Sequence, residues 1–313
     1  MTDAAPAAPV RRTGRRWLFA AVGAVAAVAA LLPWFLTGGR MPLQNLWSEI
    51  PADIPFVLLP FHPYTATLTA ALLLIGAAAA GIAGRALGAG RTRGATLLLI
   101  GGLLLVQGAA VIQSALTPRA TLPDRGDADL YMTALTVGTV LALLAGLGIL
   151  ALIARAPRAG AVIGLSIGAV AAGTWLAAVI VPFGSVPQEV PALLPLVQWV
   201  APVLAGAAIA WAGIGSAGRI VAALGAVLIV WIGPAVLTGV GYALGSRVLW
   251  NDPAGMVDGA IQVFGLALLT PELAWRPVVA CVLAAAVGLG IRTLVARRRT
   301  GGTSAAEEGL RHA

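Results

Sequence analysis

Residues 131–158, YMTALTVGTVLALLAGLGILALIARAPR, place a long uncharged and mostly apolar run directly before a turn that contains two arginines. A helix needs about 20 apolar residues to cross a hydrocarbon core ~30 Å thick. Comparable runs recur along the chain, and eight of them have this length. They are residues 17–36, 64–84, 94–116, 131–154, 159–181, 193–214, 220–244 and 277–296. The sequence therefore predicts an all-α fold, a polytopic integral membrane bundle of about eight transmembrane helices.

The composition supports a membrane protein and excludes several other classes. Hydrophobic residues make up 59% of the chain and charged residues 10%, whereas soluble domains carry about 25% charged residues. The net charge of +8 comes from arginines at the ends of apolar runs, so it indicates orientation rather than nucleic-acid binding. The chain has no lysine, which excludes a Walker A lysine or a Schiff base. Cys281 is the single cysteine, so no intrachain disulfide can form.

The turns between the predicted spans alternate in charge. Fifteen of the twenty arginines fall on one side of the membrane, and nine of the twelve acidic residues fall on the other. The positive-inside rule then places both termini in the cytoplasm of a cell (plasma) membrane protein. We expect disordered ends at 1–16 and 297–313 around a helical domain at 17–296. The use of arginine alone with much Ala, Gly and Val suggests a bacterial genome of high GC content.

One apolar segment, at 253–269, is too short for a simple span. Asp252 can cap a helix that begins at Pro253, and Thr270 followed by Pro271 repeats this start signal. A helix over these residues would be about 25 Å long at 1.5 Å per residue. We expect an interfacial or re-entrant outer helix here. The alternative, a full span, would place the C-terminus outside.

Small residues and two motif-like strings point to helix packing rather than to chemistry. Gly160, Gly164 and Gly168 recur every four residues, which lets another helix approach closely, either within the chain or in a homodimer. Residues 164–168 fit the nucleophile-elbow formula and 213–218 the dinucleotide fingerprint. Neither has the strand that these motifs require. Residues 16–25 and 219–227 resemble each other, which indicates either a parallel duplication or chance similarity in Ala/Val/Gly-rich sequence.

Few polar residues lie inside the spans, and ionisable residues are absent from the centre of every predicted span. Gln107, Ser114 and Gln198 are the candidates for a polar substrate path. Hydrogen bonding between helices is the other interpretation of these residues. The lack of buried carboxylates argues against a proton-driven pump.

The outer loops contain the candidate catalytic and metal-binding residues. Five prolines in the loop 37–63 predict a compact, bent segment, in which the apolar stretch 54–61 is expected in the headgroup region. Glu49, Asp53, His62 and Asp127 are the catalytic candidates, with His62 as a general base. Asp124, Asp127 and Asp129 are the candidates for a divalent cation site. The alternative is that these charges are simply solvated.

Three functions fit these observations. The first is a transporter or permease-like membrane component that moves a small or amphipathic substrate. The second is a non-catalytic partner or assembly factor of an envelope complex. The third, which the lack of a catalytic motif disfavours, is an enzyme acting on a lipid-linked substrate at the outer face. We expect no cofactor and no nucleic-acid partner. The expected partners are the lipid bilayer and other membrane subunits or a second copy of the chain.

Overall fold

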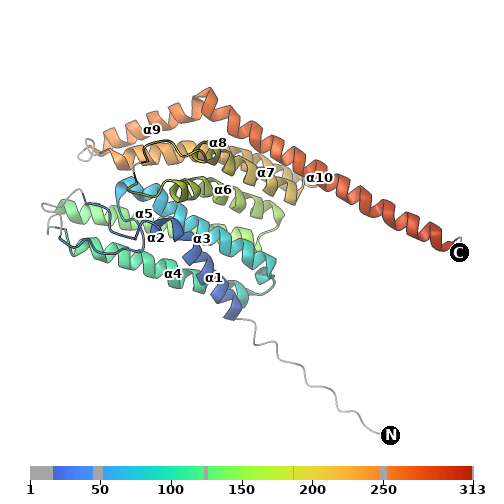
Figure 1. Ribbon diagram of the computed structural model, residues 1–313, viewed down its shortest axis with the longest axis horizontal. Coiled ribbons are helices and arrows are strands. Elements are labelled where there is room, and N and C mark those ends of the chain that lie inside the picture. The colour runs from blue at the N-terminus through green and yellow to red at the C-terminus, as the bar shows by residue number, and fades with distance from the viewer. Residues whose placement is uncertain (1–16, 45–51, 123–125, 186, 247–251, 312–313) are drawn as a thin grey trace, which may run out of the picture.

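The computed structural model describes residues 17–44, 52–122, 126–185, 187–246 and 252–311 and is all-helical over these residues apart from loops and one isolated β-bridge, between Arg40 and Phe56. Figure 1 shows long helices running side by side. In chain order they are α1 (Trp17–Ala30), α2 (Leu32–Phe35), α3 (Ala66–Ala86), α4 (Arg93–Arg119), α5 (Gly126–Arg155), α6 (Arg158–Ile180), α7 (Val200–Ala212), α8 (Ala217–Gly245), α9 (Pro253–Leu269) and α10 (Pro271–Arg311).

Seven helical segments within the described residues are long and apolar enough to cross a membrane. They are Pro63–Ala86, Arg93–Arg119, Ala128–Arg155, Arg158–Ile180, Leu194–Ala212, Ala217–Gly245 and Ala274–Ala296. Helices α1 and α9 are apolar but shorter. The predicted helical membrane bundle is confirmed, and the extra short helix predicted at 253–269 has the predicted bounds.

The first predicted span differs from the structure, because it is broken rather than continuous. Helix α1 ends at Ala30 and is followed by the single turn of α2. Pro33 has no backbone N–H, so it cannot continue the hydrogen-bond ladder of α1. The N–H groups of Trp34 and Phe35 both donate to the carbonyl oxygen of Leu31 instead. The apolar run alone did not reveal this break.

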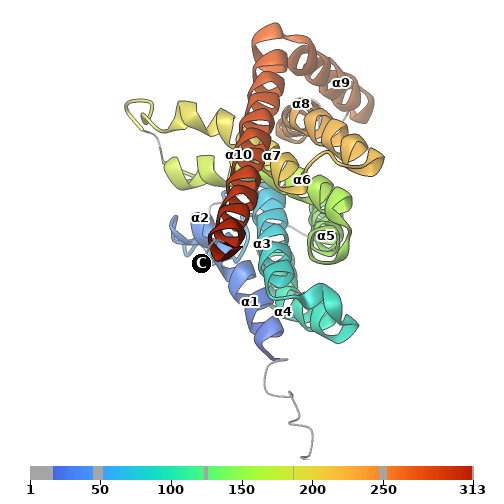
Figure 2. The same ribbon diagram turned by 90° about the vertical axis from the view of Figure 1, so that its right-hand side faces the viewer.

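The long helices form two units of four with the same pattern of neighbours. The first unit comprises α1, α3, α4 and α5, and the second comprises α6, α7, α8 and α10. In each unit the first helix packs against the second and the third, and the second packs most extensively against the fourth. Figure 2 shows the first unit, coloured blue to green, below the second, coloured yellow to red.

Glycines allow the close approach of helices within both units. The contacts of α3 with α5, α6 with α8, and α7 with α10 join helices that run in the same direction. The glycine contacts are Gly102 with Ala20 (α4 and α1), Gly146 with Ala77 (α5 and α3), Gly225 with Ile163 (α8 and α6) and Gly288 with Ala210 (α10 and α7).

In each unit the second helix follows a 3₁₀ segment, Pro63–Thr65 or Leu194–Trp199. The second unit therefore has the same order of helix contacts and the same helix directions as the first, which is what a parallel repeat, one of the repeat symmetries of transporters, would give.

The similarity of residues 16–25 to 219–227 does not identify this repeat. That match would make α1 equivalent to α8, whereas the order of contacts makes α1 equivalent to α6. Both strings consist largely of Ala, Val and Gly, so chance similarity stays one of the two interpretations.

Helix α9 begins and ends as its sequence predicts. The Asp252 carboxylate accepts a hydrogen bond from the N–H of Gly255 at 3.0 Å. From there α9 runs back along α8 (Figure 1). The indole N–H of Trp231, midway along α8, donates to the carbonyl oxygen of Leu268 at 3.2 Å. Helix α9 therefore dips along the bundle instead of lying flat across its end.

The two ends of the chain were expected to be disordered. Residues 1–16 lie outside the described residues. Residues 297–311 form the last turns of α10, which continues to Arg311. The Ala, Glu, Leu and Arg residues of this segment favour helix, whereas its three glycines disfavour it. The segment is too polar to belong to a membrane span. Both ends of the described chain lie at the same end of the bundle (Figure 1).

Candidate functional site

The loop between α2 and α3, which the sequence predicts at the outer face, folds into a compact structure over the end of the first unit. We call residues 39–44 and 52–62 the outer cap. The side chains of Val57, Leu59 and Phe61 are buried, and Val57 and Leu59 pack in one apolar cluster with Trp34 of α2. Val57, Leu59 and Phe61 of the stretch 54–61 thus pack against the protein, while Phe56 is exposed. The position of this stretch in the headgroup region stays a prediction.

Two neighbouring polar side chains of α4 hold the backbone of the outer cap. The N–H of Leu58 donates to Oε1 of Gln113 at 2.9 Å, and the N–H of Leu59 donates to Oγ of Ser114 at 2.8 Å. The amide nitrogen of Gln113 also donates to the carbonyl oxygen of Phe56 at 2.8 Å. Ser114, a candidate for the substrate path, is fully buried and satisfies the backbone of the cap.

His62 is the last residue of the outer cap, and Tyr131 of α5 is hydrogen-bonded to the cap. His62 is 4% exposed, and its Nδ1 accepts a hydrogen bond from the N–H of Tyr64 at 3.1 Å. The His62 and Tyr64 rings stack with their centroids 4.9 Å apart. The hydroxyl of Tyr131 donates to Oε1 of Gln44 at 2.8 Å, which links α5 to the cap. His62 is therefore enclosed by protein, unlike a general base that faces water.

The predicted carboxylates do not form a site within the described residues. Asp53 and Asp129 are exposed. Glu49 and Asp124 lie outside the described residues, as does the side chain of Asp127. No group of three His, Cys, Asp or Glu side chains in the described part of the chain could hold a metal ion.

Gln107 and Gln198 lie outside the main cavities. The buried amide nitrogen of Gln107 donates to the carbonyl oxygen of Leu73 at 3.0 Å. Gly76 leaves room for this amide, because a Cβ there would lie 2.5 Å from the Gln107 nitrogen. Gln198 is exposed and donates to the carbonyl oxygen of Pro195 within its own turn. These contacts are those of helix packing and of a local turn.

The glycine face of α6 packs within the chain. A Cβ at Gly164 would meet Ile153 of α5, and a Cβ at Gly168 would meet Ala78 of α3 at 2.9 Å. A Cβ at Gly160 would meet Ala156 in the turn before α6. This face therefore joins the two units, and nothing in these contacts requires a second copy of the chain.

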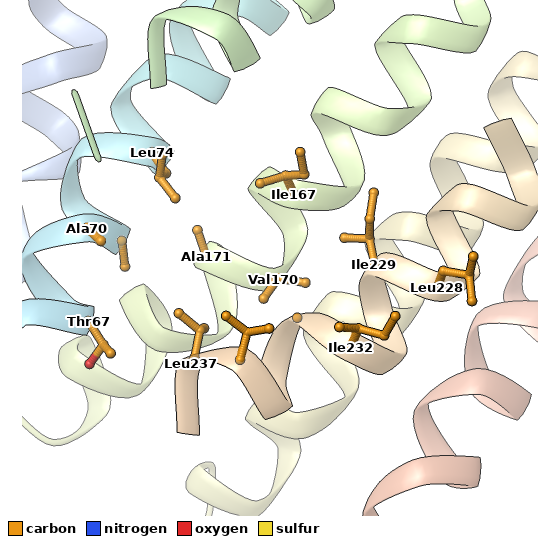
Figure 3. Close-up of a pocket in the computed structure, with 13 residues that line it drawn as sticks. Thr67, Ala70, Leu74, Ile167, Val170, Ala171, Leu228, Ile229, Ile232 and Leu237 are labelled. Carbon is orange, nitrogen blue, oxygen red and sulfur yellow. The ribbon is translucent and has the colours of Figure 1, made fainter. Parts of the chain in front are cut away.

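A hollow lies between the two units, lined by residues of α3, α5, α6 and α8. We call it the interunit groove. It consists of two adjoining cavities of about 360 and 220 Å³, which share Thr67, Ala70 and Leu237 as lining residues. Figure 3 shows the larger cavity between α3, α6 and α8. Of the side chains labelled there, only Thr67 contains a polar atom.

The groove has a buried floor and an exposed rim. Ala71 and Ala171, on the floor, are 3% and 4% exposed, while Leu228 and Val236, at the rim, are 48% and 43% exposed. Most polar lining residues belong to the smaller cavity, beneath the outer cap. They are His62, Thr67, Thr69, Tyr131 and Thr139. The groove thus has aliphatic walls along most of its length and polar groups toward one end.

A cluster of arginines around one tryptophan lies at the opposite end of the bundle. The guanidinium carbons of Arg85 (α3) and Arg158 (α6) lie 5.1 and 5.9 Å from the ring centroid of Trp211 (α7). Arg85 also donates to the carbonyl oxygens of Ile153 and Ala156, at the end of α5. This cluster bridges the two units, and the sequence assigned its arginines only to orientation.

Comparison of the chain with protein-family models, with curated proteins and with solved structures finds no match. The functional argument therefore depends on the geometry of the groove and of the arginine cluster.

Proposed function

We propose that this chain is a transporter-class membrane protein that moves an amphipathic substrate along the interface between its two units. The main support is the position of the interunit groove, between two four-helix units that share one order of helix contacts. Transporters built from parallel repeats bind their substrates at the repeat interface. Relative movement of the two units would change access to a ligand held there.

The lining of the groove favours a hydrocarbon chain as the bound part of the substrate. Binding pockets for small molecules usually have volumes of ~300–1,000 Å³, and the larger cavity alone has about 360 Å³. Its walls are aliphatic, and its rim is exposed where the bilayer would lie. The polar residues near His62 and Thr67 would face the polar part of the substrate. A lipid or a lipid-linked molecule has this distribution of polarity.

The other two functions receive less support. The enzyme hypothesis required Asp53, His62 and Asp127 to converge, and of these Asp53 is exposed while His62 is buried. The hypothesis of an assembly partner used the glycine face of α6, which packs against α3 and α5. Neither observation favours a second candidate function.

We also propose the orientation that the arginines indicate, with both termini in the cytoplasm of a bacterial cell membrane. Single cysteines at Thr92 and Asp129, in a Cys281→Ala background, would test it with a membrane-impermeant maleimide on intact cells. Labelling at position 129 alone would support the orientation. Labelling at position 92 alone would reverse it.

Photochemical labelling tests the groove directly. The purified protein would be reconstituted with a phosphatidylglycerol that carries a diazirine midway along one acyl chain, and the labelled peptides would be mapped. We expect labelling at lining residues such as Val170 and Ile232, reduced by unlabelled lipid. The Ala70→Leu variant fills the junction of the two cavities and should weaken labelling about tenfold, because the larger side chain occupies space that the acyl chain needs and a tenfold loss of affinity corresponds to about 1.4 kcal/mol.

The matched control is Ala109→Leu, the same enlargement at an exposed position of α4. Uniform labelling of all exposed helix faces, unaffected by Ala70→Leu, would refute binding in the groove. Transport itself is measured by the exchange of a fluorescent phosphatidylglycerol between the leaflets of proteoliposomes. Labelling without protein-dependent exchange would leave a lipid-binding protein and refute the transport function.

A further inference from the structure

The arginine cluster around Trp211 lies at the helix ends opposite the outer cap. Arg85 is next to the last residue of α3, Arg158 is the first residue of α6, and Trp211 is next to the last residue of α7. Figure 2 views the bundle from this end. Tryptophan and arginine at the ends of spans lie at the depth of lipid headgroups.

The cluster concentrates positive charge without nearby carboxylates. Two guanidinium groups lie within 6 Å of one indole ring. A third arginine, Arg292 of α10, donates to the carbonyl oxygens of Ala210 and Trp211 at 3.1 and 3.0 Å. In the sequence, the acidic residues of the segments at this end are limited to Asp3, Glu307 and Glu308, which lie near the chain termini.

The arginines of the cluster differ in how accessible their N–H donors are to a ligand. Arg85 is partly buried and holds two carbonyl oxygens of the chain. Arg158 is exposed and lies against the ring of Trp211, which is itself 42% exposed. The exposed guanidinium of Arg158 can therefore donate to an outside oxygen atom while it remains stacked.

From this geometry we propose that the Arg85–Arg158–Trp211 cluster binds the phosphate of an anionic phospholipid headgroup between the two units. A planar guanidinium suits a phosphate through paired N–H donors. Basic pockets between helices at the cytoplasmic surface bind anionic headgroups in this way. The location at the span ends selects a lipid over a soluble phosphate. This site is separate from the interunit groove and does not depend on the proposed transport.

Paired lipids test the proposal. Thermal stability of the detergent-solubilised protein would be titrated with phosphatidylglycerol and with phosphatidylcholine of the same acyl chains. We expect the wild type to bind phosphatidylglycerol more tightly. Arg158→Gln should lower this preference about fivefold, since one arginine near the surface contributes about 1 kcal/mol. Arg158→Lys, which keeps the charge, should retain part of it.

The control is Arg93→Gln, which removes one exposed positive charge from the same end of the bundle at the start of α4. The melting temperature of each variant in phosphatidylcholine shows whether it has folded. An equal loss of preference in Arg93→Gln would refute a specific site, because general surface charge would then be the cause. Equal protection by inorganic phosphate would refute a lipid headgroup as the ligand.

Discussion

The adjacent glycines Gly101 and Gly102 of α4 should respond to alanine in opposite ways. A Cβ on Gly102 would overlap the carbonyl oxygen of Ala20 and lie 2.9 Å from its Cα. These are backbone atoms of α1, so the clash cannot be relieved by rotating a side chain. A Cβ on Gly101 meets nothing within 4 Å. Both positions are helical, and glycine is about 1 kcal/mol less favourable than alanine in a helix.

The expected magnitudes follow from these contacts. Overpacking costs about 1–3 kcal/mol, and a clash between two backbones belongs near the upper end of this range. Alanine's preference for helix offsets about 1 kcal/mol of this cost, so Gly102→Ala should destabilise the bundle by about 2 kcal/mol. Gly101→Ala, which has the preference without the clash, should leave the stability unchanged or raise it by up to about 1 kcal/mol.

The assay is reversible unfolding of both variants in mixed micelles of dodecyl maltoside and SDS. Cysteine cross-linking between α1 and α4 would report whether the helices have separated. Equal stabilities of the two variants would refute the reasoning, because they would show that α1 and α4 are not in backbone contact at Gly102.

Three other substitutions test individual contacts. Gln107→Leu removes one hydrogen bond, worth about 0.6 kcal/mol in a membrane protein, and also the buried Gln107 Oε1, for which the described structure shows no partner. We therefore expect unchanged or higher stability in the same micelle assay, and a large loss would show that the amide is needed. Ser114→Ala leaves the N–H of Leu59 without its acceptor and should cost about 1–3 kcal/mol, with faster proteolysis of the outer cap as the second measurement. Asp252→Ala removes the cap of α9 and should cost about 1 kcal/mol, seen as faster hydrogen exchange in the first turn of α9, whereas Asp258→Ala should leave this exchange unchanged.

Local sequence signals predicted the helices well. Each long span combines length with apolar character, and the short helix α9 has a capping aspartate and a proline at its start. The break at Leu31 was missed, because Pro33 lies in an otherwise continuous apolar run. Hydropathy measures the cost of leaving water and does not register a missing N–H.

The candidate site could be predicted only in part. Ser114 and Gln107 were identified as polar groups inside spans, and helix–helix hydrogen bonding was one of the two interpretations. Gln107 does make a hydrogen bond between helices, whereas Ser114 accepts a hydrogen bond from the outer cap. The groove gave no signal, because Ala71, Ala171 and Val236 do not differ in kind from residues that face lipid. The cluster around Trp211 depends on which helices are neighbours, and the alternation of charge does not contain this information.

The outer cap also has a consequence for the order of events during biosynthesis. The N–H groups of Leu58 and Leu59 are satisfied by side chains 55 residues further along the chain. At about 5–20 residues per second, α4 supplies these acceptors roughly 3–11 s after the cap is made. We therefore expect the nascent cap to stay open to protease while α3 inserts, and to become protected once α4 has left the ribosome. Arrested chains that end before Gln113 would leave the cap open, and chains that extend far enough beyond Arg119 for α4 to have left the ribosome would protect it.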